Sequence, residues 1–240
     1  MVKFCPFFIT FAKAQMSKVF RYMIVCVLLL CTQSSLAEDF FDVEGYNCQK
    51  HKGESSFSAQ VDFPSVGPAA CLIQARQWVC EVLGIDAPLR VDGAMFARLL
   101  QEAAEDYVDS VRGRRTVEIE WAFEDPTCVT FLATVRDRDS VEWTSQDCAT
   151  FSKADGHRLT ADDIFNCSEG QVKQLMWKYR DGLPMEVGKA DDLYVGDVGF
   201  IDGWVVVIGP ARNYTGAAYK IRYQEAEPYL KHYAAGYYGN

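Results

Sequence analysis

The chain has 240 residues, with 33 Asp and Glu against 24 Lys and Arg, and a net charge of −9. This length suits one domain, with room for a small N-terminal appendage. The acidic balance argues against nucleic acid or an anionic membrane surface as a partner, and it favours a basic protein partner.

The first part of the chain predicts an export signal. Lys18 and Arg21 precede the apolar run 23–30, and the small residues Ser35 and Ala37 stand where a signal peptidase reads. We therefore expect a signal peptide over 1–37, and a periplasmic or secreted mature chain. The alternative, a transmembrane anchor, needs about 20 apolar residues. Residues 1–15 look like an extension, because Met16 would begin a signal peptide of ordinary length.

Six cysteines follow the signal segment, at positions 48, 71, 80, 128, 148 and 167. An even number in an exported chain indicates disulfide bonds, although several pairings are open. If 137–139 is the tip of a hairpin, Cys128 and Cys148 lie opposite each other. We therefore hypothesise a Cys128–Cys148 disulfide.

Regular elements are predicted along most of the remaining chain. Residues 38–55 are polar and are expected to be irregular. The alternation of apolar and polar residues predicts strands near 56–63, 116–123, 127–135 and 141–151, and the helical apolar stripes predict helices near 69–83 and 93–108. The strand 116–123 should have one apolar and one acidic face.

The C-terminal half adds a turn, a capped helix and a hairpin. Thr160 and Asp163 have the spacing of a capping box, and an amphipathic helix is predicted near 169–181. Asp202-Gly203 predicts a two-residue turn of type I′ before the buried strand 205–208, with a further strand at 218–223. The expected fold is α+β: one domain over 56–233 whose antiparallel sheet, a meander plus a C-terminal hairpin, packs against amphipathic helices, with a tail at 234–240.

Catalytic motifs are scarce in this sequence. The three histidines lack metal-binding spacing, and no nucleophile elbow, phosphate-binding loop or dinucleotide fingerprint occurs. We therefore predict no catalytic residues, no metal and no cofactor, and a protein that is not an enzyme. The alternative is an envelope hydrolase, or a deacetylase-associated enzyme, that uses His157 with Asp155 or Asp162.

Aromatic residues crowd the last thirty positions, as they do at interfaces and sugar-binding surfaces. The loop 210–216 and the tyrosines after it are the expected binding face. In the alternative interpretation, Tyr219, Tyr223 and Tyr229 close the core. The candidate ligand-binding residues are Arg212, Asn213, Tyr214, Tyr219 and His157.

Two segments carry a family resemblance. Residues 156–165, GHRLTADDIF, resemble the "G-k-x-L-t-l-d-D-l-F" segment of a family of exported bacterial domains of unknown function. Gly199-Phe200, the segment 216–218 and the ending EPYL at 227–230 resemble the C-terminal motifs of the same family. The resemblance extends over 56–230. The family includes the lysozyme-binding ectodomain of RsiV-type anti-sigma factors and the accessory domain of PdaC-type peptidoglycan deacetylases.

The resemblance implies a non-catalytic binding domain for a cell-envelope ligand, either a protein such as a lysozyme-type muramidase or a glycan such as peptidoglycan. One departure stands out: the family's Gly-Gly-Ala-His-Gly signature has no counterpart between Val141 and Ala154. Any role tied to that signature is therefore not carried over to this chain.

Overall fold

The computed structural model describes residues 40–139, 141–184 and 187–231. Its helices and strands all belong to one compact unit that begins at Phe41. The predicted signal peptide, 1–37, and the predicted tail, 234–240, lie outside the described residues. Within the described part of the chain, no helix is both long and apolar enough to cross a membrane.

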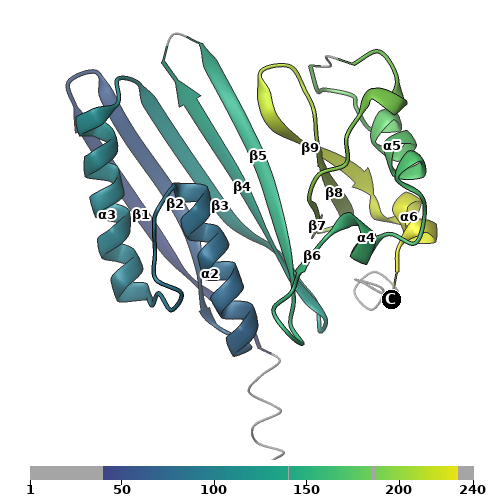
Figure 1. The fold of residues 1–240 in the computed structure, drawn as a ribbon, viewed down its shortest axis with the longest axis horizontal. Helices are drawn as coiled ribbons and strands as arrows, with labels where there is room; N and C mark the ends of the chain where they lie inside the picture. The colour runs from purple at the N-terminus through teal and green to yellow at the C-terminus, as the bar shows by residue number, and fades with distance from the viewer. Residues whose placement is uncertain (1–39, 140, 185–186, 232–240) are drawn as a thin grey trace, which may run out of the picture. The chain divides into compact units, whose positions relative to one another are not determined.

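The N-terminal half is a long-stranded sheet interrupted by two helices (Figure 1). Its elements are β1 (Asp42–Lys52), β2 (Ser55–Val66), α2 (Ala69–Leu83), α3 (Gly93–Ser110), β3 (Arg114–Glu124), β4 (Cys128–Arg138) and β5 (Glu142–Ser152). The predicted helices are confirmed: α2 ends at Gly84, whose positive φ of 70° suits a C-cap glycine, and Asp92 caps the start of α3.

The C-terminal half has shorter elements, and the predicted helix near 169–181 appears there as α5. They are β6 (Arg158–Leu159), α4 (Ala161–Ile164), α5 (Glu169–Lys178), η1 (Ala190–Asp192), β7 (Val198–Ile201), β8 (Trp204–Gly209), β9 (Tyr214–Arg222), α6 (Tyr223–Ala226) and η2 (Glu227–Tyr229).

The strands form one mixed sheet in the order β1-β2-β3-β4-β5-β9-β8-β7, with β6 paired to β5. The α+β class is confirmed, but the sheet is only partly antiparallel, because β2 pairs parallel to β3 and β5 parallel to β9. The first exception follows from the connection. A chain that leaves β2 and returns beside it through two helices can lie parallel, whereas a short turn would force an antiparallel partner.

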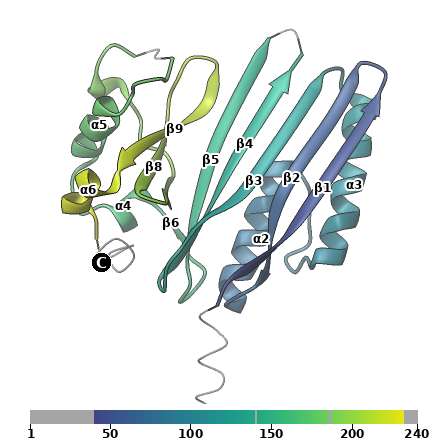
Figure 2. The same ribbon diagram turned by 180° about the vertical axis from the view of Figure 1, so that it is seen from behind.

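One face of the long strands carries the larger part of the core. Figures 1 and 2 show α2 and α3 on one face of β1–β5, and their buried side chains join those of the strands in one apolar cluster. On β3, Val117 and Ile119 point into this cluster, while Glu118 and Glu120 lie on the opposite face. The predicted division of this strand into an apolar and an acidic face is thus confirmed for residues 117–121. After the register shift that follows Trp121, Phe123 packs in a different apolar cluster.

A second apolar cluster joins β7–β9 to α4, α5 and α6. β7 also lies against β4 and β5: the Thr150 hydroxyl donates to the Val198 carbonyl (2.9 Å), and Thr130 accepts from the Phe200 amide (3.3 Å). Gly199 permits this approach, since a Cβ there would lie 2.7 Å from Thr130 Cγ2. The glycine of the Gly199-Phe200 motif therefore has a packing role.

Strand β1 corrects the expectation of an irregular segment at 38–55. Residues 42–52 pair antiparallel with β2 along their whole length. Tyr46 packs edge-on against Phe63 and Phe96, and Cys48 is buried. Because β1 is an edge strand with one solvated face, few of its side chains need to be apolar, and the alternation that marks other strands is weak here.

The turn at Asp202-Gly203 has the predicted length but not the predicted type. Ile201 pairs with Trp204, so two residues connect β7 to β8. Type I′ requires positive φ at both positions, and only Gly203 has it, at 74°. The type I′ prediction is therefore wrong.

The hairpin register rules out the hypothesised Cys128–Cys148 disulfide. Cys128 lies opposite Ser152, and Cys148 opposite Leu132. The two cysteines are thus four residues out of register, about 13 Å along the strands. The predicted register is wrong because residues 137–139 are not the tip of the hairpin. Asp137 belongs to β4 and accepts two hydrogen bonds from Arg115 of β3 (2.7 and 2.9 Å).

All six cysteines beyond the predicted signal segment are free thiols, and burial raises the pKa of each one, to about 12 for Cys71 and about 11 for Cys80. Thiolates are the reactive form. At pH 8 we expect iodoacetamide to modify the half-buried Cys167 first, and the five buried cysteines only after unfolding. Mass spectrometry of native and unfolded samples measures this. A disulfide-linked peptide in a non-reducing digest would contradict it.

Candidate functional site

A cavity of about 620 Å³ lies beside β9, where the C-terminal end of α5 meets the sheet. Segments far apart in the sequence form its walls, and the lining combines aromatic, cationic and amide side chains. The lining residues are Gln146, Lys178, Tyr179, Asp181, Gly182, Leu183, Trp204, Tyr214, Ala218, Lys220 and Arg222. We call this cavity the β9 groove.

Strand β9 supplies the groove residues through its alternation. Tyr214, Lys220 and Arg222 are separated by even numbers of residues, so they share one face of the strand. Tyr219 and Ile221 point to the opposite face and are fully buried. The Tyr219 hydroxyl donates to the Pro210 carbonyl inside the core. This corrects the assignment of Tyr219 to a binding surface and confirms the alternative, in which it closes the core.

The groove presents positive charge on an acidic protein. Arg222 lies across the ring of Trp204, with its Cζ 6.0 Å from the ring centroid, and Trp204 is its cross-strand partner. Within the described part of the chain, no carboxylate lies at ion-pair distance from Lys220 or Arg222. Both side chains are exposed, so they remain available to an anionic ligand.

Lys178 is held differently. It forms an ion pair with Glu225 of α6, and this contact raises the pKa of Lys178 and lowers the pKa of Glu225. Lys178 also lies over Tyr179, 5.5 Å from the ring centroid. Burial, followed by a hydrogen bond to Glu225, raises the pKa of Tyr179, so this residue keeps its proton at neutral pH. Asp181 is the carboxylate among the lining residues.

Gln146 joins the groove to the rest of the sheet. Its side-chain oxygen accepts a hydrogen bond from the Ala218 amide (3.0 Å), beyond the point where the β5–β9 ladder ends. The contact fixes the orientation of the amide, leaving its NH₂ group as the donor.

The predicted residues of loop 210–216 divide between the groove and its border. Tyr214 lines the groove and is half-buried. Arg212 and Asn213 are exposed in the adjoining loop and do not line it. Asn213 has a positive φ of 62°, which Asn tolerates better than most residues, and its carbonyl accepts from the Thr144 amide of β5 (3.2 Å). Asn213 thus shapes the loop.

His157 lies apart from the groove, in the connection between β5 and β6. It is exposed, and its Nε2 is 3.3 Å from Asp163 Oδ2. The Asp155 carboxylate accepts a hydrogen bond from the His157 backbone amide (3.0 Å). Neither Asp155 nor Asp162 is paired with the imidazole, as the hydrolase alternative would need. Across the described residues, no group of three or more His, Cys, Asp or Glu could hold a metal.

Asp163 instead serves the predicted capping box, which is confirmed. Its carboxylate accepts from the amide (2.9 Å) and the hydroxyl (2.7 Å) of Thr160, and these bonds lower the pKa of Asp163 below its ordinary 3.8. Asp163→Ala should cost about 1 kcal/mol at neutral pH.

A lowered folded-state pKa stabilises the fold above the ordinary pKa, and this contribution is lost as the pH falls through the folded-state pKa. The difference in urea midpoint between the native chain and Asp163→Ala should therefore have its full value at pH 7 and decrease below pH 3.8. A difference that stayed constant down to acid pH would contradict the role of the carboxylate.

Comparisons with known proteins identify the fold. No protein-family model and no curated protein matches the sequence significantly. A crystal structure of a DUF3298 family member from Bacteroides fragilis superposes with a TM-score of 0.60 at 12% identity, covering 81% of this chain and 94% of that one. A DUF3298 family protein from Pseudomonas aeruginosa gives 0.51 at 11% identity, covering 82% and 97%.

The chain thus has the α+β fold found in DUF3298 family proteins, a family named for its unknown function. At such low identity the likeness shows the fold alone. The expected relationship to RsiV-type anti-sigma factors and PdaC-type deacetylases stays a prediction.

Most residues of the β9 groove lie outside the set of candidates that the sequence indicates. Lys178, Tyr179, Trp204, Lys220 and Arg222 were not among the candidates. The alternation of Lys220 and Arg222 with Tyr219 and Ile221 was a usable signal, because it places the two cations together on the solvated face of a strand.

Proposed function

We propose that this protein is an exported, non-catalytic binding domain that holds an anionic glycan of the cell envelope in the β9 groove. The observation that carries the proposal is the lining of that groove, which sets Lys220 and Arg222 beside Trp204, Tyr179 and Tyr214. Flat aromatic faces pack against the apolar faces of sugar rings, and cationic side chains pair with carboxylates. Peptidoglycan fragments carry both chemical features.

A ligand in the cell envelope requires that the protein is exported. It is supported by the basic and apolar pattern of residues 18–37. The net charge of the whole chain favours a basic protein partner such as lysozyme. At this groove, however, Lys220 and Arg222 have no ion-pair partner among the described residues, and their positive charge would repel a basic protein. The local charge therefore favours the glycan.

Calorimetric titration of the purified protein tests the proposal with three probes. Soluble muropeptides carry carboxylates, chito-oligosaccharides have a similar sugar backbone without them, and lysozyme is a basic protein. We expect muropeptides to bind about tenfold more tightly than the neutral sugars, which corresponds to one charge-assisted contact. Absence of muropeptide binding, or saturable binding of lysozyme alone, would overturn the proposal.

A further inference from the structure

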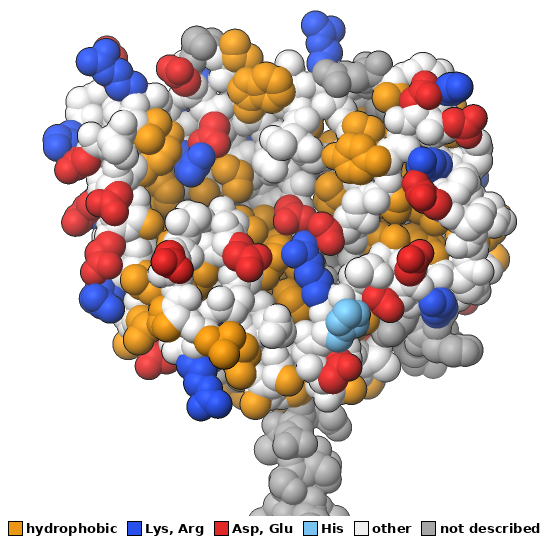
Figure 3. Space-filling view, viewed as in Figure 1, with side chains coloured by type: hydrophobic (Ala, Val, Ile, Leu, Met, Phe, Trp, Pro, Cys, Tyr) orange, Lys and Arg blue, Asp and Glu red, His pale blue; other side chains and the backbone are white. Residues whose placement is uncertain are grey.

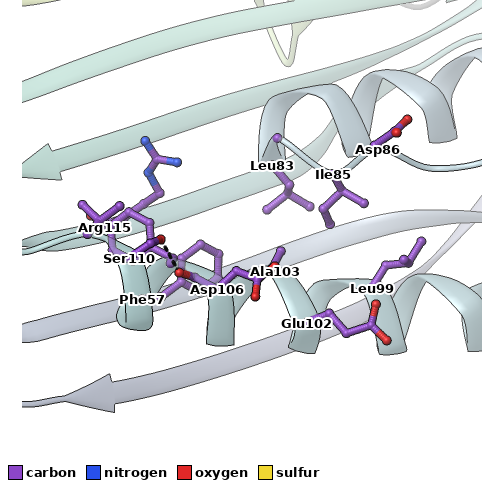
Figure 4. Close-up of a pocket in the computed structure, with 13 residues that line it drawn as sticks. Phe57, Leu83, Ile85, Asp86, Leu99, Glu102, Ala103, Asp106, Ser110 and Arg115 are labelled. Atoms are coloured by element: carbon purple, nitrogen blue, oxygen red, sulfur yellow. Dashed lines mark hydrogen bonds between the residues drawn. The ribbon is translucent and has the colours of Figure 1, made fainter.

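A second cavity, of about 330 Å³, lies between the C-terminal end of α2 and the middle of α3 (Figure 4). Its inner wall is apolar. Phe57 and Leu83 are buried at its base, while Ile85, Leu99 and Ala103 are half-buried. Apolar surface in a concavity that solvent reaches is a common feature of protein docking sites.

Carboxylates surround this apolar wall. Asp86 follows the end of α2, and Glu102 and Asp106 are one helical turn apart on α3. All three are exposed. Figure 4 shows Asp86 on one side of the cavity and the other two on the opposite side, and Figure 3 shows acidic side chains gathered over the α3 side of this face, next to exposed hydrophobic surface.

The two acidic rows of α3 differ in their partners. Glu105 and Asp109, which face β1, form ion pairs with Lys50 (2.6 Å) and Lys52 (2.8 Å). On the cavity side, Glu102 is paired with Arg98 of its own helix (3.3 Å). Among the described residues, no cation lies at ion-pair distance from Asp86 or Asp106. The negative charge is thus compensated on the β1 side of the helix and largely uncompensated at the cavity.

The cation that lines the cavity is already engaged. Arg115 makes two hydrogen bonds with Asp137 and stacks over Tyr107, with its Cζ 5.0 Å from the ring centroid. Its hydrogen bonds to Asp137 raise the pKa of Arg115, and the guanidinium is engaged in that partly exposed ion pair. Arg115 therefore does not neutralise the rim carboxylates.

We propose that this cavity is a docking site for a cationic amphipathic segment of a partner protein. An apolar side chain of the segment enters between α2 and α3, and its Lys or Arg side chains pair with Asp86, Glu102 and Asp106. The charge of the rim selects this occupant, because an acidic or neutral segment would leave the rim carboxylates unpaired. The proposal stands independently of the glycan site, which has the opposite charge.

The test uses a fluorescently labelled helical peptide of leucine and lysine, about 15 residues long, and a matched peptide in which glutamate replaces lysine. Fluorescence anisotropy follows binding to the purified protein. The lysine peptide should bind, and the variant Asp86→Asn, Glu102→Gln, Asp106→Asn should weaken it about tenfold. All three positions are exposed, so we expect the variant to fold, which circular dichroism checks.

The matched control is Glu142→Gln, Asp191→Asn, Asp202→Asn, which removes the same charge from exposed carboxylates that do not line the cavity. It should bind the lysine peptide as the native chain does. Leu99→Ser should weaken binding without a change in net charge. Equal weakening by the rim and control variants, equal binding of the two peptides, or no binding of the lysine peptide would each overturn the proposal.

Discussion

Gly156→Ala is expected to destabilise the protein by at least about 3 kcal/mol, which is large against ordinary domain stabilities. Gly156 has φ of 75°, and a Cβ there would collide with the backbone of the first turn of α2, at the Ala70 carbonyl and 2.8 Å from the Cys71 nitrogen. Because these are backbone atoms, no side-chain rotation relieves the clash. Chemical denaturation of the two proteins measures the difference.

Gly203→Ala is the matched control. Its φ of 74° is nearly the same, but nothing lies within 4 Å of the added Cβ. It should therefore cost only the left-handed strain, about 1 kcal/mol. If the two variants lost equal stability, the connection between β5 and β6 would not pack on α2 as described.

Trp204→Ala is expected to weaken muropeptide binding at least about tenfold, because it removes an aromatic face of the β9 groove and the surface on which Arg222 rests. The variant Lys220→Ala, Arg222→Ala should weaken binding by a similar factor. Its effect should diminish at high salt, whereas the loss caused by Trp204→Ala should persist. Calorimetric titrations at two salt concentrations measure both effects.

The control for these variants is Arg212→Ala, which removes an exposed cation from the adjoining loop without touching the groove. It should leave binding nearly unchanged. If Arg212→Ala weakened binding as strongly as the Lys220 and Arg222 variant, the ligand would be held by the net charge of this end of the molecule. The groove geometry would then not explain recognition.

Local patterns predicted the elements that depend on neighbours in the sequence. The apolar stripes of α2 and α3, the glycine stop at Gly84, and the capping box of Thr160 and Asp163 all act within a few residues. The glycines in the two motifs that carried the family resemblance also have physical explanations, since Gly156 packs on α2 and Gly199 on β4.

Contacts between distant segments were beyond local patterns. The parallel pairing of β2 with β3 depends on where two helices return the chain. The β4–β5 ladder runs out to Arg138 and Glu142, so the charged residues 136–138 belong to a strand and pair with β3 through contacts such as Arg115–Asp137. The β9 groove combines side chains from β5, the end of α5, β8 and β9. Only Tyr214 among them was expected, because no short stretch of sequence contains the groove.

The β9 groove as the binding site can be tested most directly by heteronuclear NMR of the purified protein during a muropeptide titration. We expect the shift changes to concentrate on the Trp204 indole and on the amides of Tyr179, Lys220 and Arg222, and to saturate. Shift changes that saturate elsewhere, with the Trp204 indole unmoved, would contradict it.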